Sequence, residues 1–297
     1  MCTYALVAKT PSEILATPPP SPEAGMYLDL LRRCLTREIF NDEDLVFAPA
    51  RGLTWKGRAI RRALGVVKHP RIVRLIHNPQ RLEDKLEGVG WPRSAEVMCG
   101  SRRLEFLQKT LYAIEREGID GDFFEGGCWR GGAVILMMAA LRALRGQHRR
   151  LVWAADSFEG YPAPTANSSQ DDKDLYEERA YFHVTRSEFE QNLERYGVHG
   201  PELRVLEGYF DKSLPAAPIE RLALIRIDID GYEGVRAILE NLYPKLVPGG
   251  FVVVDDYLAI GARRAIDEYI AKHRLENELH TIPQKTLAKG MYFRRES

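Results

Sequence analysis

The chain of 297 residues lacks several features that would assign a protein to a familiar class at once. No apolar run approaches the roughly 20 residues that a bilayer-spanning helix needs. The first residues do not combine a basic stretch with a hydrophobic one, so we expect neither a membrane span nor a signal peptide. The four cysteines lie far apart without a Cys-x-x-Cys pair. This spacing argues against a disulfide or zinc framework and favours reduced thiols in a cytoplasmic protein.

An excess of charge of either sign is also absent. Lys+Arg and Asp+Glu both number 42, so the composition does not indicate a nucleic-acid or membrane partner. Residues 45–82 nevertheless carry nine basic and no acidic residues. Two amphipathic helices with solvated basic faces would explain this segment, as would an anionic partner, a membrane surface or a subunit interface. Because no nucleic-acid-binding motif accompanies the charge, we expect no nucleic-acid partner.

The remaining composition is that of a soluble globular protein. The 45% apolar residues can bury one main core. We interpret residues 1–90 as a proline-rich linker and a basic helical extension, and residues 91–297 as the main domain. Its predicted strands cover residues 122–127, 151–156, 203–208, 222–228 and 249–256, with a closing pair at 278–282 and 290–294. The predicted helices cover residues 103–117, 232–246 and 262–273.

These elements alternate, and the strands are apolar without a polar face. That pattern predicts an α/β fold with a Rossmann-like, doubly wound and mostly parallel sheet covered by helices on both sides. The closing pair of strands predicts an antiparallel edge. The long polar stretch at residues 157–181, which we call the lid segment, is typical of a structureless loop that is either disordered or covers a ligand.

The sequence Glu125-Gly-Gly-Cys-Trp-Arg-Gly-Gly132 joins the first strand of this domain to a helix. Small residues at such a turn allow backbone N–H groups to approach a ligand closely. The spacing differs from the Gly-x-Gly-x-x-Gly fingerprint of dinucleotide-binding proteins. A carboxylate at this position would repel a pyrophosphate but could bind an ammonium or sulfonium group. The turn therefore favours S-adenosylmethionine over NAD(P).

Acidic residues follow most of the predicted parallel strands, where ligands bind in an open α/β sheet. They are Glu125, Asp156, Asp228, Asp230, Asp255 and Asp256. Any single one could simply cap a helix or begin a loop. As a set they require cations, because carboxylates are seldom buried without a partner. Asp156 suits ribose hydroxyls, and three carboxylates on two later strands suit Mg²⁺ or Ca²⁺.

Several separate stretches resemble the macrocin O-methyltransferase family (TylF/MycF type), and together they span about Tyr27 to Arg295. They are Tyr27 to Thr36, Gly90-Trp-Pro92, Met98-Cys-Gly100, Glu125 to Gly132, Ala155 to Gly160, Gly208 to Pro215 and Tyr243 to Tyr257. This family consists of Mg²⁺-dependent enzymes that methylate sugar hydroxyls of bacterial natural products. Here Ile229 replaces a glycine that the family usually has, and Gly126 replaces a threonine.

The resemblance implies a set of site residues. For the cofactor S-adenosylmethionine they are Met98, Glu125, Gly126, Gly127, Gly131, Asp156, Ser157, Gly208, Tyr209 and Asp228. For the metal they are Asp228, Asp255 and Asp256. Asp228 or Asp230 would accept the acceptor's proton, with His273 and His280 as rival bases.

The resemblance also implies a small glycosylated acceptor and a homo-oligomer formed through the N-terminal region. Two alternatives from other classes are an NAD(P)-dependent oxidoreductase and a non-catalytic nucleotide-binding or scaffold protein. The absent dinucleotide fingerprint argues against the first, and the set of acids argues against the second.

Overall fold

The computed structural model describes residues 10–40, 46–47, 82–88, 91–92, 94–144, 149–275, 279–285 and 290–296. Nearly all of the basic segment 45–82 lies outside these residues, so the helices predicted there stay predictions. Across the part of the chain that is described, no helix has both the length and the apolar character that crossing a bilayer requires.

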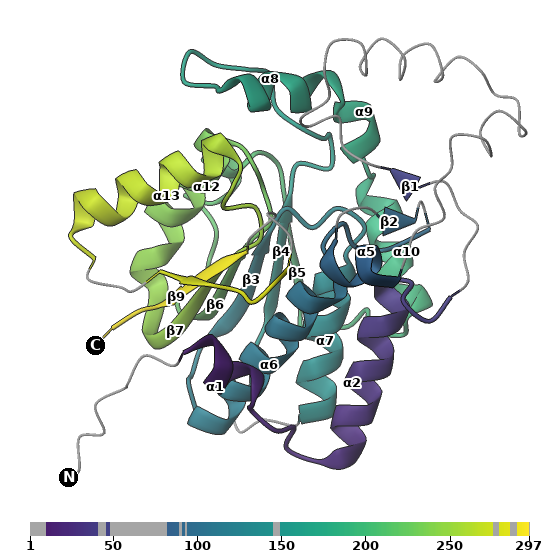
Figure 1. Cartoon of the computed structure of the whole chain (residues 1–297). Helices are drawn as coiled ribbons and strands as arrows, with labels where there is room; N and C mark the ends of the chain where they lie inside the picture. Colours follow the sequence, from purple (N-terminus) through teal and green to yellow (C-terminus); the bar gives the residue numbers. More distant parts are fainter. Residues whose placement is uncertain are drawn as a thin grey trace, which may run out of the picture.

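A seven-stranded sheet forms the centre of the molecule, with the order β5-β4-β3-β6-β7-β9-β8 (Figure 1). Its strands are β3 (Asp122–Gly126), β4 (Val152–Asp156), β5 (Leu203–Glu207), β6 (Leu222–Ile227), β7 (Leu246–Val254), β8 (His280–Thr281) and β9 (Met291–Arg294). The first five run parallel, whereas β9 is antiparallel to both β7 and β8. The predicted fold with its antiparallel edge is therefore confirmed.

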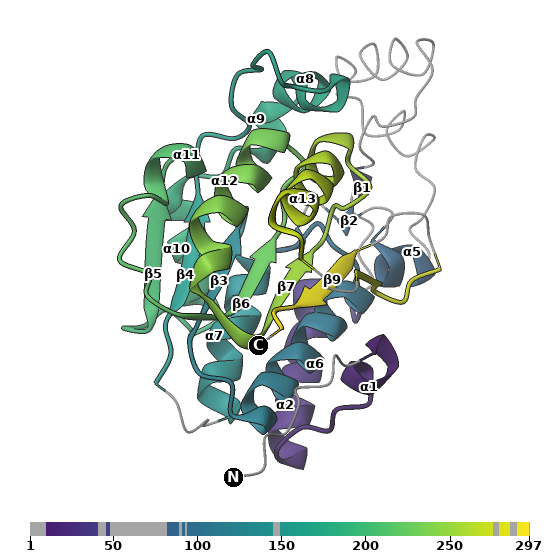
Figure 2. The ribbon, with the colours of Figure 1, turned by 90° about the vertical axis from the view of Figure 1, so that its left-hand side faces the viewer.

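Helices cover both faces of this sheet (Figures 1 and 2). On one side lie α6 (Ser101–Glu117), α7 (Gly132–Leu144) and α10 (Arg186–Arg195), and on the other α12 (Tyr232–Leu242) and α13 (Ile260–His273). Neighbouring strand residues contribute to opposite cores. Phe123 packs with the first group of helices and Phe124 with the second. This explains why the strands read as continuous apolar runs.

Two helix ends follow from local chemistry. α6 ends at Gly118, which adopts a left-handed φ of 64° that a glycine tolerates without strain. The helix predicted over 232–246 ends at Leu242 and is followed by the 3₁₀ turn η1 (Tyr243–Lys245). Pro244 accounts for this change, because proline has no N–H group to continue an α-helix. A short helix, α11 (Phe210–Ser213), follows β5.

The N-terminal part packs against the main domain. It comprises α1 (Pro11–Leu15), α2 (Pro22–Leu35), α5 (Leu82–Glu87) and the small antiparallel pair β1 (Val46–Phe47) and β2 (Trp91–Pro92). The side chains of Leu28 and Leu35 on α2 are fully buried in the core that contains α6 and α7. A division of the chain at residue 90 stays a prediction.

The lid segment is not structureless as the sequence suggests. It contains α8 (Gln170–Glu177) and leads into α9 (Arg179–Phe182), both located above the carboxyl ends of the strands in Figure 1. Ser169 and Asp172 cap α8 reciprocally, each side chain accepting a hydrogen bond from the other's backbone. The helix is highly polar and buries Leu175, so its sequence gives almost no apolar periodicity.

Candidate functional site

A cavity of about 430 Å³ opens at the carboxyl ends of β3, β4 and β6, beneath the lid segment. Its lining contains more acidic than basic side chains. The acids are Glu96, Glu125, Asp156, Asp172, Asp211, Asp228 and Glu233, against the bases Lys212, Arg226 and Arg236. Because acids outnumber bases among the lining residues, the cavity suits a ligand with positive charge.

The glycine turn forms the floor of the cavity. Gly127 has a φ of +88°, and a Cβ atom built on it would lie 2.3 Å from the backbone oxygen of Asp228. Gly131 has a φ of +87° and would meet Phe189 and Leu193 at 2.8 Å. The turn therefore depends on glycine for both its backbone conformation and its close packing.

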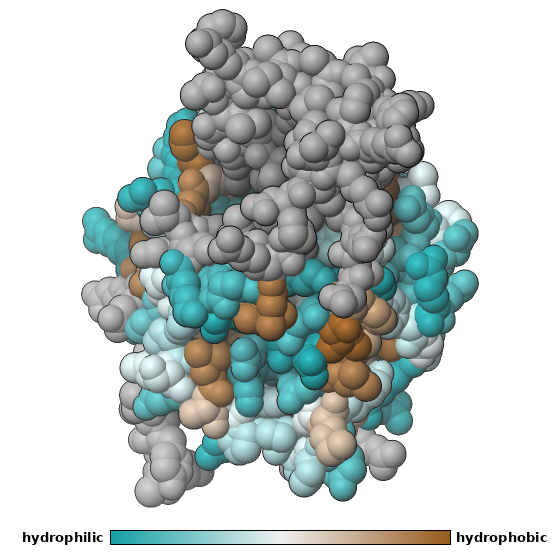
Figure 3. Space-filling view, turned by 45° about the vertical axis from the view of Figure 1, so that its right-hand side comes forward, coloured by the Kyte–Doolittle hydropathy of each residue, from teal (hydrophilic) through white to brown (hydrophobic). Residues whose placement is uncertain are grey.

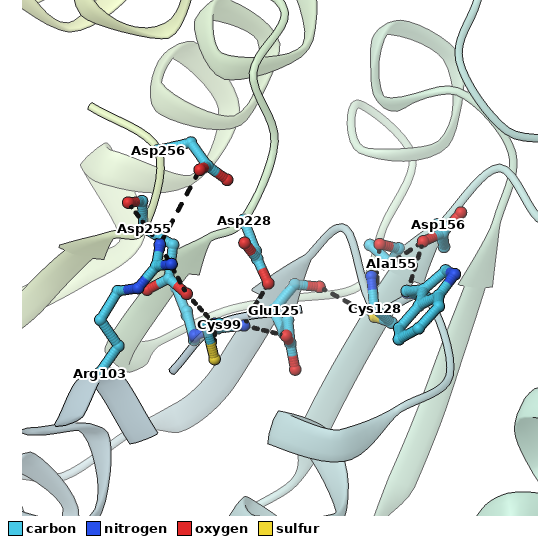
Figure 4. A network of polar contacts seen from close by, with 11 residues as sticks. Cys99, Arg103, Glu125, Cys128, Ala155, Asp156, Asp228, Asp255 and Asp256 are labelled. Carbon is cyan, nitrogen blue, oxygen red and sulfur yellow. Dashed lines mark hydrogen bonds and ion pairs between the residues drawn. The ribbon is translucent and has the colours of Figure 1, made fainter. Parts of the chain in front are cut away.

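Asp156, at the end of β4, holds this turn in place (Figure 4). Its Oδ2 atom accepts hydrogen bonds from the backbone N–H groups of Cys128 (2.8 Å) and Trp129 (3.1 Å). Its Oδ1 atom accepts one from the N–H group of Phe158 (2.9 Å). Burial raises the pKa of Asp156, while these N–H groups lower it. The residue predicted to bind ribose thus also joins two strand ends.

Arg226 is a buried cation at the centre of the acidic strand ends. It extends from β6 with 1% of its surface exposed. Its guanidinium forms short ion pairs with Glu125 Oε1 and Asp255 Oδ2, and lies 3.1 Å from Asp228 Oδ2. β6 lies between β3 and β7 in the sheet, which places Arg226 between their terminal carboxylates.

A second buried arginine, Arg103 on α6, approaches the same group of acids. Its Nη1 atom donates to the backbone oxygen of Asp255 at 3.0 Å and lies 3.9 Å from Asp256 Oδ1 (Figure 4). Four carboxylates, those of Glu125, Asp228, Asp255 and Asp256, therefore face two guanidinium groups. Among the described residues, the acids of this group outnumber the arginines.

The electrostatic environment reflects this imbalance. Burial raises the pKa of Glu125 from 4.5 to about 7, and the neighbouring Asp255 adds to the rise while Arg226 opposes it. Burial, together with Asp255 and Asp256, raises the pKa of Asp228 well above its ordinary value. Glu125 is 1% exposed, and its Oε2 atom has no hydrogen-bond partner among the described residues. That oxygen is an unused acceptor beside the cavity.

A divalent cation fits these residues in charge and chemistry but not in their present arrangement. The all-carboxylate donor set matches Mg²⁺. However, within the described ranges no three His, Cys, Asp or Glu side chains are arranged as metal ligands. Asp228 and Asp255 instead turn their oxygens toward Arg226.

Ile229 fills the space between the glycine turn and the start of α12. A Cβ atom on Gly127 would lie 2.6 Å from Ile229 Cγ2, and one on Gly234 would lie 2.7 Å from Ile229 Cδ1. Two glycines therefore leave room for the side chain that departs from the family pattern. Ile229 lines the cavity, so it affects which ligands fit there.

The structure brings together only part of the predicted set. Met98, Glu125, Gly127, Asp156, Ser157, Tyr209 and Asp228 line the cavity. The residues of the predicted set that do not line it are Gly126, Gly131, Gly208, Asp230, Asp255 and Asp256. Gly126 packs against Ile238, and the N–H group of Gly208 donates to the Asp156 backbone oxygen at 2.9 Å.

The two rival bases lie elsewhere. The ring of His273 packs against Tyr269 in a tilted arrangement at the end of α13, and His280 stacks on Tyr292 at the sheet edge. Neither lines the cavity.

Sequence reasoning missed Arg226, Arg103 and Tyr161. Only Arg226 leaves a signal, as the one charged residue within the apolar strand Leu222–Ile227. Tyr161, in the lid segment, lines the cavity and donates a hydrogen bond from its hydroxyl to Asp230 Oδ2 at 2.7 Å.

The sheet order, the glycine turn after β3 and the acid-lined cavity define a class I, S-adenosylmethionine-dependent methyltransferase. The structure of the O-methyltransferase NovP has this fold, with a TM-score of 0.76 and 33% identity over 92% of this chain and 100% of that chain.

Residues 24–295 match the family described as macrocin-O-methyltransferase (TylF), and the chain belongs to that family. A relative from Streptomyces olivaceus, 8-demethyl-8-(2,3-dimethoxy-alpha-L-rhamnosyl)-tetracenomycin-C 4'-O-methyltransferase, is 36% identical over 86% of this chain and 89% of its own. Mycinamicin III 3''-O-methyltransferase from Micromonospora griseorubida is 32% identical over 94% and 99%, respectively. The protein is thus an O-methyltransferase, and the oxidoreductase and scaffold alternatives are removed.

Replacing Arg226 by methionine should destabilise the protein by about 3–5 kcal/mol, because buried carboxylates then lose their partner. Urea denaturation measures this change. Arg221→Met is the matched control, since Arg221 is 61% exposed and pairs with Asp120 at the surface. The control should cost less than about 1 kcal/mol. An equal, small effect of both substitutions would show that Arg226 does not hold the strand ends together.

Binding of S-adenosylhomocysteine should release a proton near pH 6.5. Glu125, with a pKa of about 7 in the free protein, is partly protonated there, and a bound ammonium would favour its ionised form. Calorimetry in buffers of different ionisation enthalpy measures the released proton. Glu125→Gln should abolish the release and weaken binding about tenfold or more. Binding without proton exchange in the wild-type protein would contradict this role.

The same shift predicts how the free protein responds to pH. Because its folded pKa is raised, Glu125 contributes stability that is present below about 4.5 and lost as pH rises through about 7. Cofactor binding should reduce this loss of folding stability at higher pH.

Proposed function

We propose that the protein transfers a methyl group from S-adenosylmethionine to a sugar hydroxyl of a bacterial natural product, with a divalent cation such as Mg²⁺. The relatives support the acceptor class, since the names of two of them specify a rhamnosyl-tetracenomycin and mycinamicin III. The observation that carries the proposal is the buried Glu125, whose unpartnered Oε2 atom lies at the glycine turn beside an acid-rich cavity.

The cavity offers a place for each part of the cofactor. Glu125 would bind the ammonium group of the methionine end, next to the close backbone approach at Gly127. Asp156 would accept hydrogen bonds from the ribose, in addition to those that it accepts from the turn. Tyr209, at the end of β5, would lie near the adenine.

The acceptor would then occupy the part of the cavity between Asp228, Ile229 and the lid segment. Its hydroxyl oxygen would attack the methyl group of the cofactor, and holding the two reactants in a reactive orientation would provide much of the rate enhancement. Asp228 and Asp230 are the candidates for accepting the proton. The lid segment contacts the start of α12 through Asn167, which donates to Glu233 at 2.8 Å, and would exclude water during transfer.

For the metal, the proposed ligands are Asp228, Asp255 and Asp256. A bound divalent ion would lower the pKa of an acceptor hydroxyl and fix its orientation. The all-carboxylate donor set of these residues supports this proposal. Asp228 and Asp255 would have to turn away from Arg226 to bind the ion.

Two further parts of the proposal concern the setting of the enzyme. We propose a cytoplasmic homo-oligomer formed through the N-terminal region, where Met26, Tyr27 and Leu30 on α2 are 74%, 45% and 53% exposed. Figure 3 shows that apolar side chains on this side of the molecule are separated by hydrophilic ones. The proposed contact between subunits would therefore combine apolar and polar groups.

Methyl transfer is tested by mixing the enzyme with S-adenosylmethionine and either the tetracenomycin derivative or mycinamicin III. Mass spectrometry should detect a product that is one methylene heavier for at least one of these acceptors.

Asp156→Ala should weaken S-adenosylhomocysteine binding about tenfold or more, through lost hydrogen bonds to the charged carboxylate. Undetectable binding of both S-adenosyl compounds to the folded wild-type protein would contradict the proposal.

The metal is tested with Asp256→Asn, because Asp256 is 29% exposed and its replacement leaves the Arg226 ion pairs intact. Mg²⁺ should raise the melting temperature of the wild-type protein but not of this variant. Chelator should abolish transfer, and excess Mg²⁺ should restore it. Asp267→Asn, a substitution on the exposed side of α13, is the control and should behave as wild type. Full activity of metal-stripped enzyme would exclude the metal mechanism.

A further inference from the structure

Trp129, on the glycine turn, carries a buried polar group without a partner. The residue lines the cavity, and 7% of its surface is exposed. Its Nε1–H group is buried and has no hydrogen-bond partner among the described residues. Such a donor destabilises the folded protein, and native structures contain few of them. An unpartnered donor in a residue that lines a ligand cavity indicates that the ligand supplies the partner.

The backbone at Trp129 is also strained. Its φ of +46° lies in the left-handed region that favours glycine. Hydrogen bonds to Asp156 Oδ2 hold the strained backbone, one from the N–H group of Trp129 at 3.1 Å and one from that of Cys128 at 2.8 Å. Strained positions of this kind cluster at active sites and ligand sites. The turn thus places a large side chain where glycine would be less costly, which points to a role for that side chain.

The immediate surroundings of the indole favour an anion, although acids outnumber bases in the cavity lining. The guanidinium group of Arg130 lies over the ring of Trp129, with 4.3 Å between its central carbon and the ring centre. Arg130 is not among the lining residues. Its positive charge nevertheless favours a negatively charged partner for the indole N–H group.

We propose that the indole N–H group of Trp129 binds the carboxylate of the methionine end of S-adenosylmethionine. The inference rests on the proposed function, in which Glu125 binds the ammonium group. Ammonium and carboxylate are bonded to the same carbon, so the carboxylate lies close to the same turn. Glu125 and Asp156 line the cavity there and would repel it. A neutral N–H donor provides the carboxylate with a charge-assisted hydrogen bond. Because Nε1 is covered in the free protein, the indole turns toward the cavity as the ligand enters.

A purely structural role in the core is the competing explanation, and Trp153 on β4 provides the matched comparison. Trp153 is 4% exposed, does not line the cavity, and donates from Nε1 to Asp122 Oδ2 at 2.8 Å. Replacing either tryptophan by phenylalanine removes the same atoms, but only Trp153 loses a hydrogen bond. The melting temperature of Trp153→Phe should therefore be about 2–4 °C lower than that of Trp129→Phe.

Ligand binding should show the opposite order. Calorimetry compares S-adenosylhomocysteine with its decarboxylated analogue, which keeps the ammonium group. Trp129→Phe should weaken binding of S-adenosylhomocysteine about tenfold or more, and that of the analogue less than about threefold, because only the first contains the carboxylate. Trp153→Phe should bind both compounds as the wild-type protein does.

Nuclear magnetic resonance tests the contact in the wild-type protein. The chain has four tryptophans, and single Trp→Phe variants assign their ¹⁵N-labelled indole N–H signals. Addition of S-adenosylhomocysteine should move the Trp129 signal downfield, as expected for an N–H group that gains a hydrogen bond, and the decarboxylated analogue should not. The Trp153 signal should stay in place with both compounds.

Three results would overturn the inference and leave the proposed function standing. The first is an affinity of Trp129→Phe for S-adenosylhomocysteine within about threefold of wild type, or an equal loss for both compounds. The second is a Trp129 indole signal that does not respond to S-adenosylhomocysteine. The third is a melting temperature of Trp129→Phe no higher than that of Trp153→Phe. If the folded wild-type protein binds neither S-adenosylmethionine nor S-adenosylhomocysteine, the proposed function itself fails.

Discussion

The site depends on the ion pairs that Arg226 forms with neighbouring carboxylates. A guanidinium within a strand of a doubly covered sheet has no water to solvate it, so it requires carboxylates on both sides. Glu125 lies in β3 and Asp255 directly follows β7, the strands on either side, and the three side chains fix one another at the sheet's carboxyl edge. The same contacts orient Glu125 so that one oxygen meets Arg226 and the other remains without a partner.

The balance of charge around Arg226 connects structure and chemistry. Four carboxylates lie around two buried arginines. Burial raises the pKa of Glu125 and of Asp228, and the neighbouring carboxylates add to the rise. A ligand with an ammonium and a sulfonium group would compensate one side of this cluster, and a divalent ion the other. Ligands of positive charge would therefore stabilise the site as well as react in it.

The sequence predicts the fold well because its evidence is local. Strands that are apolar on both faces, and acids where they end, are visible without knowledge of which strands are adjacent. The position of Arg226 beside Glu125 is not visible in the sequence, because β3 and β6 are neighbours in space but separated by more than 90 residues along the chain. The contact between Tyr161 and Asp230 joins residues 69 positions apart and is equally invisible. α8 was missed because a polar helix held by its caps lacks apolar periodicity.

A crystal structure of the complex with S-adenosylhomocysteine tests the central claim most directly. The account predicts that the ammonium nitrogen lies about 2.7–3.2 Å from Glu125 Oε2, with Arg226 still bound to the other oxygen. A complex in which Arg226 leaves Glu125, or in which the ammonium group is bound elsewhere, would contradict it.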